Sequence, residues 1–193
     1  MSDPRSASLR AMLLAALLAS LTSVLSLIRI PLPFTPVPIT GQTVAVMLAG
    51  ALLGPRWGAI SQMLYVAMGI VGLPVFAGGT AGLSVLVGPT GGYLVGFIAG
   101  AWTTGVLLPA KPGFGVARAL SAALAGGVVV VYLVGIPWLS IVAGLSLRKA
   151  LFVGAFPFLP GDIAKAVVVA LLLPRLCRLL HVPGYRNASG EGR

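Results

Sequence analysis

The sequence predicts an all-α integral membrane protein, a bundle of six transmembrane helices with both termini in the cytoplasm. Of its 193 residues, 58% are hydrophobic and 8% are charged, and the mean hydropathy is +1.06. A soluble domain carries about 25% charged residues, so this chain cannot cover a water-facing surface. Apolar runs of spanning length recur between turn residues, and the basic residues concentrate in alternate loops.

Six apolar runs define the predicted spans, within a single membrane domain of residues 1–193. The first run follows Arg5 and Arg10, so a cleaved signal peptide is the alternative to a span there. The prolines of residues 30–40 break the helical pattern and predict a stiff extended loop. Gly54-Pro55 marks the next turn. The spans are placed at 9–28, 42–54, 57–73, 91–109, 118–136 and 161–180.

Three other segments do not fit a simple span. Residues 74–90 are glycine-rich and uncharged, which predicts irregular backbone that packs in protein or lines a cavity. Residues 137–160 mix apolar side chains with Arg148 and Lys149, and either a loop with a surface helix or a further span fits them. The tail 183–193 is polar and is predicted to be disordered.

The basic residues set the predicted orientation. With both termini inside, nine fall on the inner side and three on the outer side, and Lys165 lies within the bundle, which accounts for all 13. Cytoplasmic loops carry such an excess. The inner set is Arg5, Arg10, Arg56, Lys111, Arg118, Arg175, Arg178, Arg186 and Arg193, and the outer set is Arg29, Arg148 and Lys149.

Several classes of function are excluded by composition. The net charge of +10 is scattered over loops and ends, so no nucleic acid partner is expected. The single cysteine, Cys177, excludes an internal disulfide, and no metal-ligand spacing or P-loop occurs. We expect no enzyme activity, no metal and no cofactor, and ATP-driven work would need a separate subunit.

Asp162 is the most informative residue, because the other two acids, Asp3 and Glu191, lie in the terminal segments. Lys165 follows it on the same helix face, and an ionisable pair inside a membrane segment usually serves a polar ligand. The predicted topology brings Gln42 and Tyr93, in the first turns of the second and fourth spans, to the same outer level. Three helix N-termini also favour an anionic group there.

Each of these residues also has a purely structural interpretation. Asp162 could cap its helix, and Lys165 could extend to the membrane surface. Tyr93 could belong to an interfacial aromatic belt, and Gln42 could join two helices. The small-residue stripe Ala11, Ala15 and Ala19 fits either packing inside the bundle or a partner surface.

Four motifs occur in order across residues 30–165, namely IPLPFTPVPITGQT, GGTAG, GPTGGYLVGF and PGDIAK. Together they resemble the BioY family, the biotin-specific substrate-binding membrane subunits (S components) of energy-coupling factor transporters. The resemblance implies a multi-pass protein of the bacterial cytoplasmic membrane that binds biotin with high affinity for vitamin uptake. It also implies a transmembrane coupling protein and two cytoplasmic ATPases as partners, besides membrane lipid. A homo-oligomer is left open.

The resemblance further implies site residues. Gln42, Gly79, Thr80, Tyr93, Asp162 and Lys165 would bind biotin, with Phe34, Leu83 and Val85 against its apolar parts. Residues 30–40, with Pro31, Phe34 and Pro36, would form a lid. The stripe Ala11, Ala15 and Ala19 would dock the coupling protein. Phe97 stands where an arginine for the biotin carboxylate would be sought, so backbone N–H groups and Lys165 remain alternative carboxylate ligands.

Two other functions compete with this hypothesis. Some members of the family are reported to work without a dedicated coupling module, so the chain could be a self-sufficient biotin carrier with Asp162 as a proton site. A small membrane enzyme or assembly factor is disfavoured, because no catalytic constellation occurs in the sequence.

Overall fold

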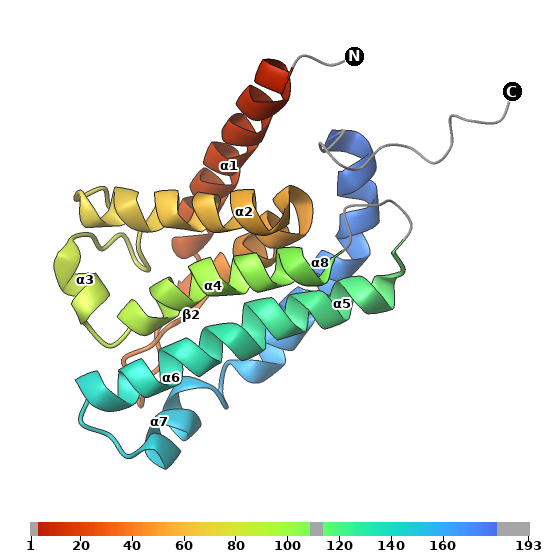
Figure 1. The fold of residues 1–193 in the computed structure, drawn as a ribbon. Helices are drawn as coiled ribbons and strands as arrows, with labels where there is room; N and C mark the ends of the chain where they lie inside the picture. The colour runs from red at the N-terminus through yellow and green to blue at the C-terminus, as the bar shows by residue number, and fades with distance from the viewer. Residues whose placement is uncertain (1–3, 109–113, 181–193) are drawn as a thin grey trace, which may run out of the picture.

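The computed structural model describes residues 4–108 and 114–180, and side chains within 8–108 and 114–177. Apart from one pair of short strands and an isolated bridge between Phe76 and Thr80, the regular secondary structure of these residues is helical (Figure 1). The elements are α1 (Pro4–Ser26), β1 (Arg29–Ile30), β2 (Ile39–Thr40), α2 (Gln42–Ile70), α3 (Leu83–Val87), α4 (Gly91–Leu107), α5 (Val116–Leu124), η1 (Ala125–Val130), α6 (Val131–Val142), α7 (Leu147–Gly154) and α8 (Leu159–Leu180).

α2 consists of two helical halves that fold back on each other. Between them Gly54 has φ 75° and ψ −178°, a backbone region open essentially only to glycine, and Pro55 follows it. A Cβ added to Gly58 would lie 2.8 Å from the Cα of Gly50. Eight residues of a straight helix span about 12 Å, so the chain reverses direction at Gly54.

The helix predicted at 118–136 is longer in the structure. α5, the π-helical segment η1 and α6 follow one another without a break from Val116 to Val142, and Pro137 lies inside α6. The segment 137–160 therefore contains the end of this helix and the eight-residue α7, which meets α8 at a bend of 53°. Residues 183–193, predicted to be disordered, lie outside the described residues.

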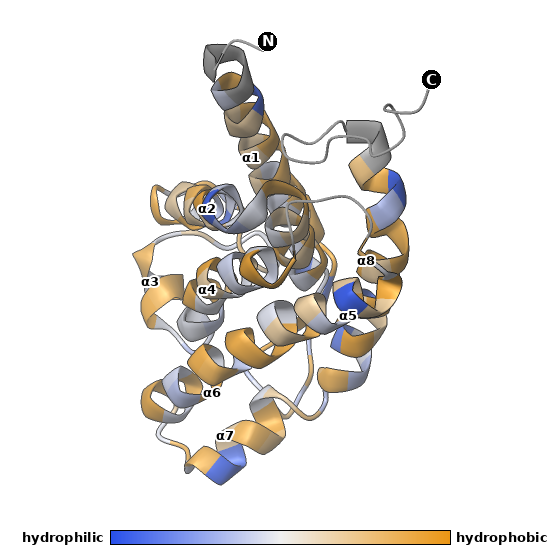
Figure 2. Ribbon diagram, turned by 45° about the vertical axis from the view of Figure 1, so that its right-hand side comes forward, coloured by the Kyte–Doolittle hydropathy of each residue, from blue (hydrophilic) through white to orange (hydrophobic). Residues whose placement is uncertain are grey.

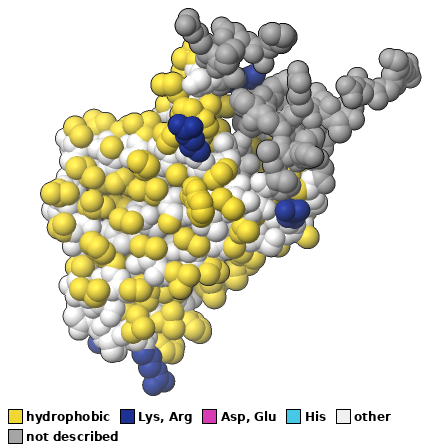
Figure 3. Space-filling model, viewed as in Figure 1, with side chains coloured by type: hydrophobic (Ala, Val, Ile, Leu, Met, Phe, Trp, Pro, Cys, Tyr) yellow, Lys and Arg dark blue, Asp and Glu magenta, His cyan; other side chains and the backbone are white. Residues whose placement is uncertain are grey.

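The helices are those of a membrane protein. Among the described residues, Ser8–Ser26, Gln42–Ile70 and Val116–Val142 are long and apolar enough to cross a bilayer, the bent pair of α7 and α8 passes the same test together, and α4 is a shorter apolar helix. Large hydrophobic side chains are exposed, such as Ile141 at 80% and Leu133 at 67%. Hydrophobic residues dominate most helices in Figure 2, and in Figure 3 they cover the middle of the face between basic side chains.

The bundle has two distinct ends. The first turn of α1 and the last turn of α8 lie at one end, whereas α7 and the start of α4 lie toward the other (Figure 1). Side chains of Arg5, Lys111, Arg178, Arg186 and Arg193, five of the nine basic residues predicted to face inward, are outside those that the structure describes.

Small residues let the central helices approach closely. A Cβ on Gly50 of α2 would collide with the carbonyl oxygen of Ala101 in α4 and would lie 2.8 Å from the Cβ of Thr104. A Cβ on Gly126 in η1 would collide with Thr104 from the other side. Close backbone contact of this kind is typical of helix packing in membranes, and it fixes the position of α4 between α2 and η1.

Candidate binding site

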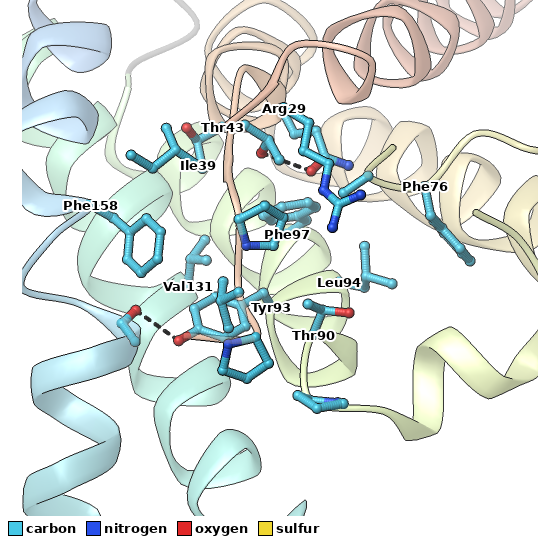
Figure 4. A pocket seen from close by; sticks show the side chains of 18 of the residues that line it. Arg29, Ile39, Thr43, Phe76, Thr90, Tyr93, Leu94, Phe97, Val131 and Phe158 are labelled. Carbon is cyan, nitrogen blue, oxygen red and sulfur yellow. Dashed lines mark hydrogen bonds between the residues drawn. The ribbon is translucent and has the colours of Figure 1, made fainter. Parts of the chain in front are cut away.

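A cavity of about 340 Å³ opens among the ends of the helices, beneath the segment that joins β1 to β2. Its wall contains side chains from the β1–β2 segment, the start of α2, residues 76–90, the start of α4, and parts of α6, α7 and α8 (Figure 4). Most of this lining is apolar, including Phe76, Leu94, Phe97, Val131 and Phe158. A pocket of this size with few polar groups is typical of a small-molecule site.

Asp162 and Lys165 line the cavity together. Asp162 is 4% exposed. Its Oδ1 accepts hydrogen bonds from Lys165 Nζ at 2.8 Å and from Thr43 Oγ1 at 3.0 Å. Lys165 Nζ also donates to the carbonyl oxygen of Thr40 at 2.6 Å and to Thr43 Oγ1 at 3.3 Å. The pair therefore joins the first turns of α8 to the end of β2 and the start of α2.

Sequence reasoning did not select Tyr132 or Thr43 as site residues. Tyr132 of α6 donates its hydroxyl hydrogen to Asp162 Oδ2, so the carboxylate accepts from three side chains on three helices. A signal was present, because Tyr132 interrupts the apolar run GGVVVVYLVG near the predicted outer end of its span. Thr43 is next to Gln42 in the chain, but the sequence does not show that its side chain faces α8.

Gln42 lines the cavity with its amide held in one orientation. Tyr65 donates its hydroxyl hydrogen to the carbonyl oxygen of Val75 at 3.1 Å, so its oxygen must accept from Gln42 Nε2. Gln42 Oε1 in turn accepts from Thr40 Oγ1 at 2.8 Å. One amide N–H and one lone pair of the carbonyl oxygen are left for a ligand.

Tyr93, also predicted, lines the cavity with a hydroxyl group that is already engaged. It donates to the carbonyl oxygen of Gly154 at 2.8 Å, which ties α4 to the end of α7. Its ring meets that of Tyr132 edge to face, with centroids 6.4 Å apart. Only the oxygen lone pairs of Tyr93 are left to interact with a ligand.

The glycine-rich loop contributes less than predicted. Thr80 lines the cavity, and its Oγ1 donates to the carbonyl oxygen of Ala77 at 3.3 Å. Gly79 is not among the lining residues, although Gly78 and Gly79 both have positive φ, 76° and 74°. Of the residues expected against the apolar part of a ligand, Val85 lines the cavity, whereas Leu83 lies outside the lining and is 58% exposed.

The proline-rich segment 30–40 lies between β1 and β2, which pair antiparallel with Arg29 opposite Thr40 and Ile30 opposite Ile39. Of the three predicted lid residues, only Pro36 lines the cavity, together with Val37, Pro38 and Ile39. Pro31 and Phe34 do not, and Phe34 is 59% exposed. The cavity is therefore covered by the second half of this segment.

Arg29 is a lining residue that sequence reasoning had treated only as a basic residue of an outer loop. A group of three or more His, Cys, Asp or Glu side chains that could hold a metal ion is not found among the described residues.

The stripe Ala11, Ala15 and Ala19 is covered in this structure, at 8%, 2% and 0% exposed. α1 is held against α2, and Gln62 Nε2 donates to Thr22 Oγ1 at 3.3 Å between them. In this conformation the stripe therefore packs inside the bundle, as one of its two interpretations expects, and its use as a docking face stays a prediction. The exposed side of α1 carries large residues instead, including Leu13 and Leu17.

Comparison with known proteins decides the family. The family model for the BioY family matches residues 1–182. The chain belongs to the BioY family. The resemblance inferred from the four motifs is thereby confirmed, and so is the all-helical membrane fold.

Named members of the BioY family match most of the chain. A "Biotin transporter BioY" of Rhizobium etli is 46% identical over 172 residues, which cover 86% of this chain and 91% of that protein. A protein with the same name from Thermotoga maritima is 43% identical over 150 residues, which cover 78% and 86%. A crystal structure described as the S-component for biotin from an ECF-type ABC transporter superposes with a TM-score of 0.84 at 31% identity, covering 92% of this chain and 95% of that one.

Proposed function

We propose that this protein binds biotin in the cavity beneath the β1–β2 segment. It then acts as the substrate-specific subunit, or S component, of an ATP-driven energy-coupling factor transporter in a bacterial cytoplasmic membrane. The observation that carries the proposal is the buried Asp162 carboxylate with its three donors, Thr43, Tyr132 and Lys165, at the wall of a mainly apolar cavity. Membership of a family whose named members are biotin transporters supports the choice of ligand.

The polar groups match the ureido ring of biotin, which has two N–H donors and one carbonyl acceptor. An ionised carboxylate has about four acceptor sites, and Asp162 uses three of them on protein donors. The remaining site on Oδ2 is free to accept one ureido N–H. Gln42 can accept the second N–H or donate to the ureido oxygen, because one lone pair and one amide hydrogen remain.

The rest of the cavity suits the apolar part of biotin. The sulfur-containing ring and the aliphatic chain lack hydrogen-bonding groups, so they are stabilised by transfer from water to an apolar surface. Leu94, Phe97, Val131 and Phe158 provide that surface around the polar groups (Figure 4). Closure of the proline-rich segment over the ligand would exclude water from the hydrogen bonds to Asp162.

The proposed topology has six membrane crossings, with the two halves of α2 counted separately and both termini in the cytoplasm. It is supported by the position of the first turn of α1 and the last turn of α8 at the same end of the bundle. Arg148 and Lys149 of α7 would then lie at the outer end of the bundle.

The proposed partners are a transmembrane coupling protein and two cytoplasmic ATPases. A self-sufficient biotin carrier with Asp162 as its proton site is the alternative.

Identification of the molecules that co-purify with the protein tests the choice of ligand. We expect mass spectrometry of tagged protein from biotin-fed cells to detect biotin at near-equimolar amount. A different bound metabolite, or empty protein that fails to take up added biotin, would contradict the proposal.

Uptake measurements in cells that lack other biotin transporters separate the two transport mechanisms. We expect uptake only when the coupling protein and both ATPases are expressed with this chain. Uptake by this chain alone that an uncoupler abolishes would establish the self-sufficient carrier instead.

A further inference from the structure

We propose that Arg29 recognises the carboxylate of the ligand and so makes the cavity selective for an acid over its uncharged derivatives. The inference rests on the proposed biotin function. Asp162 is proposed to bind the ureido ring, and Arg29 would bind the carboxylate at the other end of the ligand. Three observations carry it: the charges that line the cavity, the hydrogen bonds of Lys165, and the position of the Arg29 side chain.

Among the side chains that the structure describes, three charged ones line the cavity, namely Arg29, Asp162 and Lys165. Asp162 and Lys165 form an ion pair at 2.8 Å and neutralise each other. The positive charge of Arg29 is left without a counter-charge in the lining. Biotin carries a single negative charge at neutral pH, on its carboxylate, so the charges of the ligand and the cavity complement each other.

Lys165 is not available as the carboxylate ligand. An ammonium group has three N–H donors, and those of Lys165 point to Asp162 Oδ1 at 2.8 Å, the Thr40 carbonyl oxygen at 2.6 Å and Thr43 Oγ1 at 3.3 Å. Binding a ligand carboxylate there would break a contact that orders the α2–α8 junction. This removes one of the two ligands that the sequence left open.

The guanidinium group of Arg29 is available. Within residues 8–108 and 114–177, its side chain has no hydrogen bond or ion pair. Figure 4 shows the guanidinium group pointing from the β1–β2 segment into the ring of lining side chains. Five N–H donors in a planar fork match the two oxygens of a carboxylate.

Two features hold Arg29 at this position. Its backbone pairs with Thr40, whose carbonyl oxygen accepts from Lys165. Its side chain lies over Gly78, where an added Cβ would come within 2.9 Å of Arg29 Cδ and 3.2 Å of Cζ. Arg29 therefore spans from the proline-rich segment to the glycine-rich loop, so a carboxylate bound to it would also connect the two segments that enclose the ligand.

Binding of biotin and of biotinamide, its uncharged amide, to purified protein in nanodiscs tests the inference. We expect Arg29→Gln to weaken biotin binding roughly 10- to 100-fold, the effect of a lost charge-assisted hydrogen bond, and to change biotinamide binding less than about twofold. Arg29→Lys should restore part of the preference for the acid. Arg148→Gln, an exposed residue of α7 outside the lining, is the matched control and should bind both ligands like the parent.

Two glycine variants provide an independent arm. Gly78→Ala and Gly79→Ala impose similar strain, because both residues have positive φ, but only the Cβ at Gly78 meets Arg29. We expect Gly78→Ala to reduce the preference for biotin over biotinamide more than Gly79→Ala does.

The possible results distinguish a failure of the Arg29 inference from a failure of the proposed biotin function. Equal weakening of acid and amide by Arg29→Gln would assign a structural role to Arg29 and overturn the inference, as would no weakening of either ligand. A parent protein that binds neither ligand would contradict the biotin function itself, and the inference would fall with it.

Discussion

In the proposed function, Asp162 combines two roles that are often separate, the ordering of helices and the binding of a ligand. Its carboxylate accepts from Thr43 on α2, Tyr132 on α6 and Lys165 on its own helix, α8. These bonds hold three helices in register beneath the proposed ureido site. Because the carboxylate is only 4% exposed, loss of its charge would leave Lys165 without its partner.

The first prediction concerns the ion pair. Asp162→Asn should weaken biotin binding at least about 100-fold and destabilise the fold by about 2–3 kcal/mol, because removing one member of a buried pair strands the other. The expected loss of stability is smaller than for a fully buried pair, because the Lys165 side chain is 20% exposed. Thermal unfolding in detergent and equilibrium binding measure the two effects.

A double variant separates stability from binding. Asp162→Asn with Lys165→Met should recover part of the lost stability, because no unpaired charge remains, but it should not recover binding. A double variant that binds biotin like the parent would show that the pair is only structural.

The second prediction compares two tyrosines. Tyr132→Phe removes a donor from the proposed biotin ligand Asp162 and should weaken binding about 5- to 10-fold, the effect of one hydrogen bond of about 1 kcal/mol or slightly more. Tyr93→Phe instead strands the carbonyl oxygen of Gly154 and should lower the melting temperature more than the affinity. The reverse pattern in melting and titration experiments would contradict these roles.

The residues also show what a single sequence can reveal. Asp162, Lys165 and Gln42 could be predicted because charge or amide chemistry is conspicuous in an apolar chain. Tyr93 could be predicted from its position in the topology, and all four line the cavity. Arg29 was conspicuous too, but a basic residue beside a span is explained equally well by topology. Its position over Gly78 depends on strand pairing and loop geometry that hydropathy does not encode.

At the scale of elements, helix packing through glycine determines how α2, α4 and η1 fit together. Gly50 lies against the backbone of α4 at Ala101, and Gly105 of α4 lies against the turn at Gly54 and Pro55. Segments with Pro and Gly in a clear pattern could be predicted from the sequence, such as the turn at Gly54. The extension of the 118–136 helix to Val142 could not, because Pro137 is accommodated inside α6.

The third prediction tests this packing. Gly50→Ala should destabilise the fold by about 1–3 kcal/mol, the usual effect of overpacking, because its Cβ meets backbone rather than a movable side chain. Gly161→Ala is the matched control in α8, where a Cβ meets nothing within 4 Å. It should be neutral or slightly stabilising. Equal melting temperatures of the two variants would contradict the proposed contact.

The fourth prediction concerns the proline-rich segment. Val37 is buried and lines the cavity, whereas Phe34 is exposed and does not. Val37→Ala should speed biotin dissociation several-fold by loosening the cover, and Phe34→Ala should leave the rate within about twofold. Dissociation of labelled biotin after dilution measures both. A faster rate for Phe34→Ala than for Val37→Ala would assign the cover to the other half of the segment.

At the scale of the whole molecule, the neutral ion pair of Asp162 with Lys165 and the guanidinium group of Arg29 line a cavity at one end of an apolar bundle. A charge buried in a membrane protein is costly, so pairing Asp162 with Lys165 limits the penalty while leaving hydrogen-bonding capacity for a ligand. The alanine stripe on α1 is buried in this conformation. A coupling protein would therefore dock on other exposed residues, or α1 would have to move to expose the stripe.

Titration of purified protein in nanodiscs with labelled biotin, for the parent and for Asp162→Asn, tests the central claim most directly. We expect saturable binding of one biotin per chain to the parent, with unlabelled biotin competing, and a loss of at least about 100-fold in affinity for the variant. Binding of biotin by both proteins with the same affinity would contradict the assignment of the site, and no saturable binding by the parent would contradict the function.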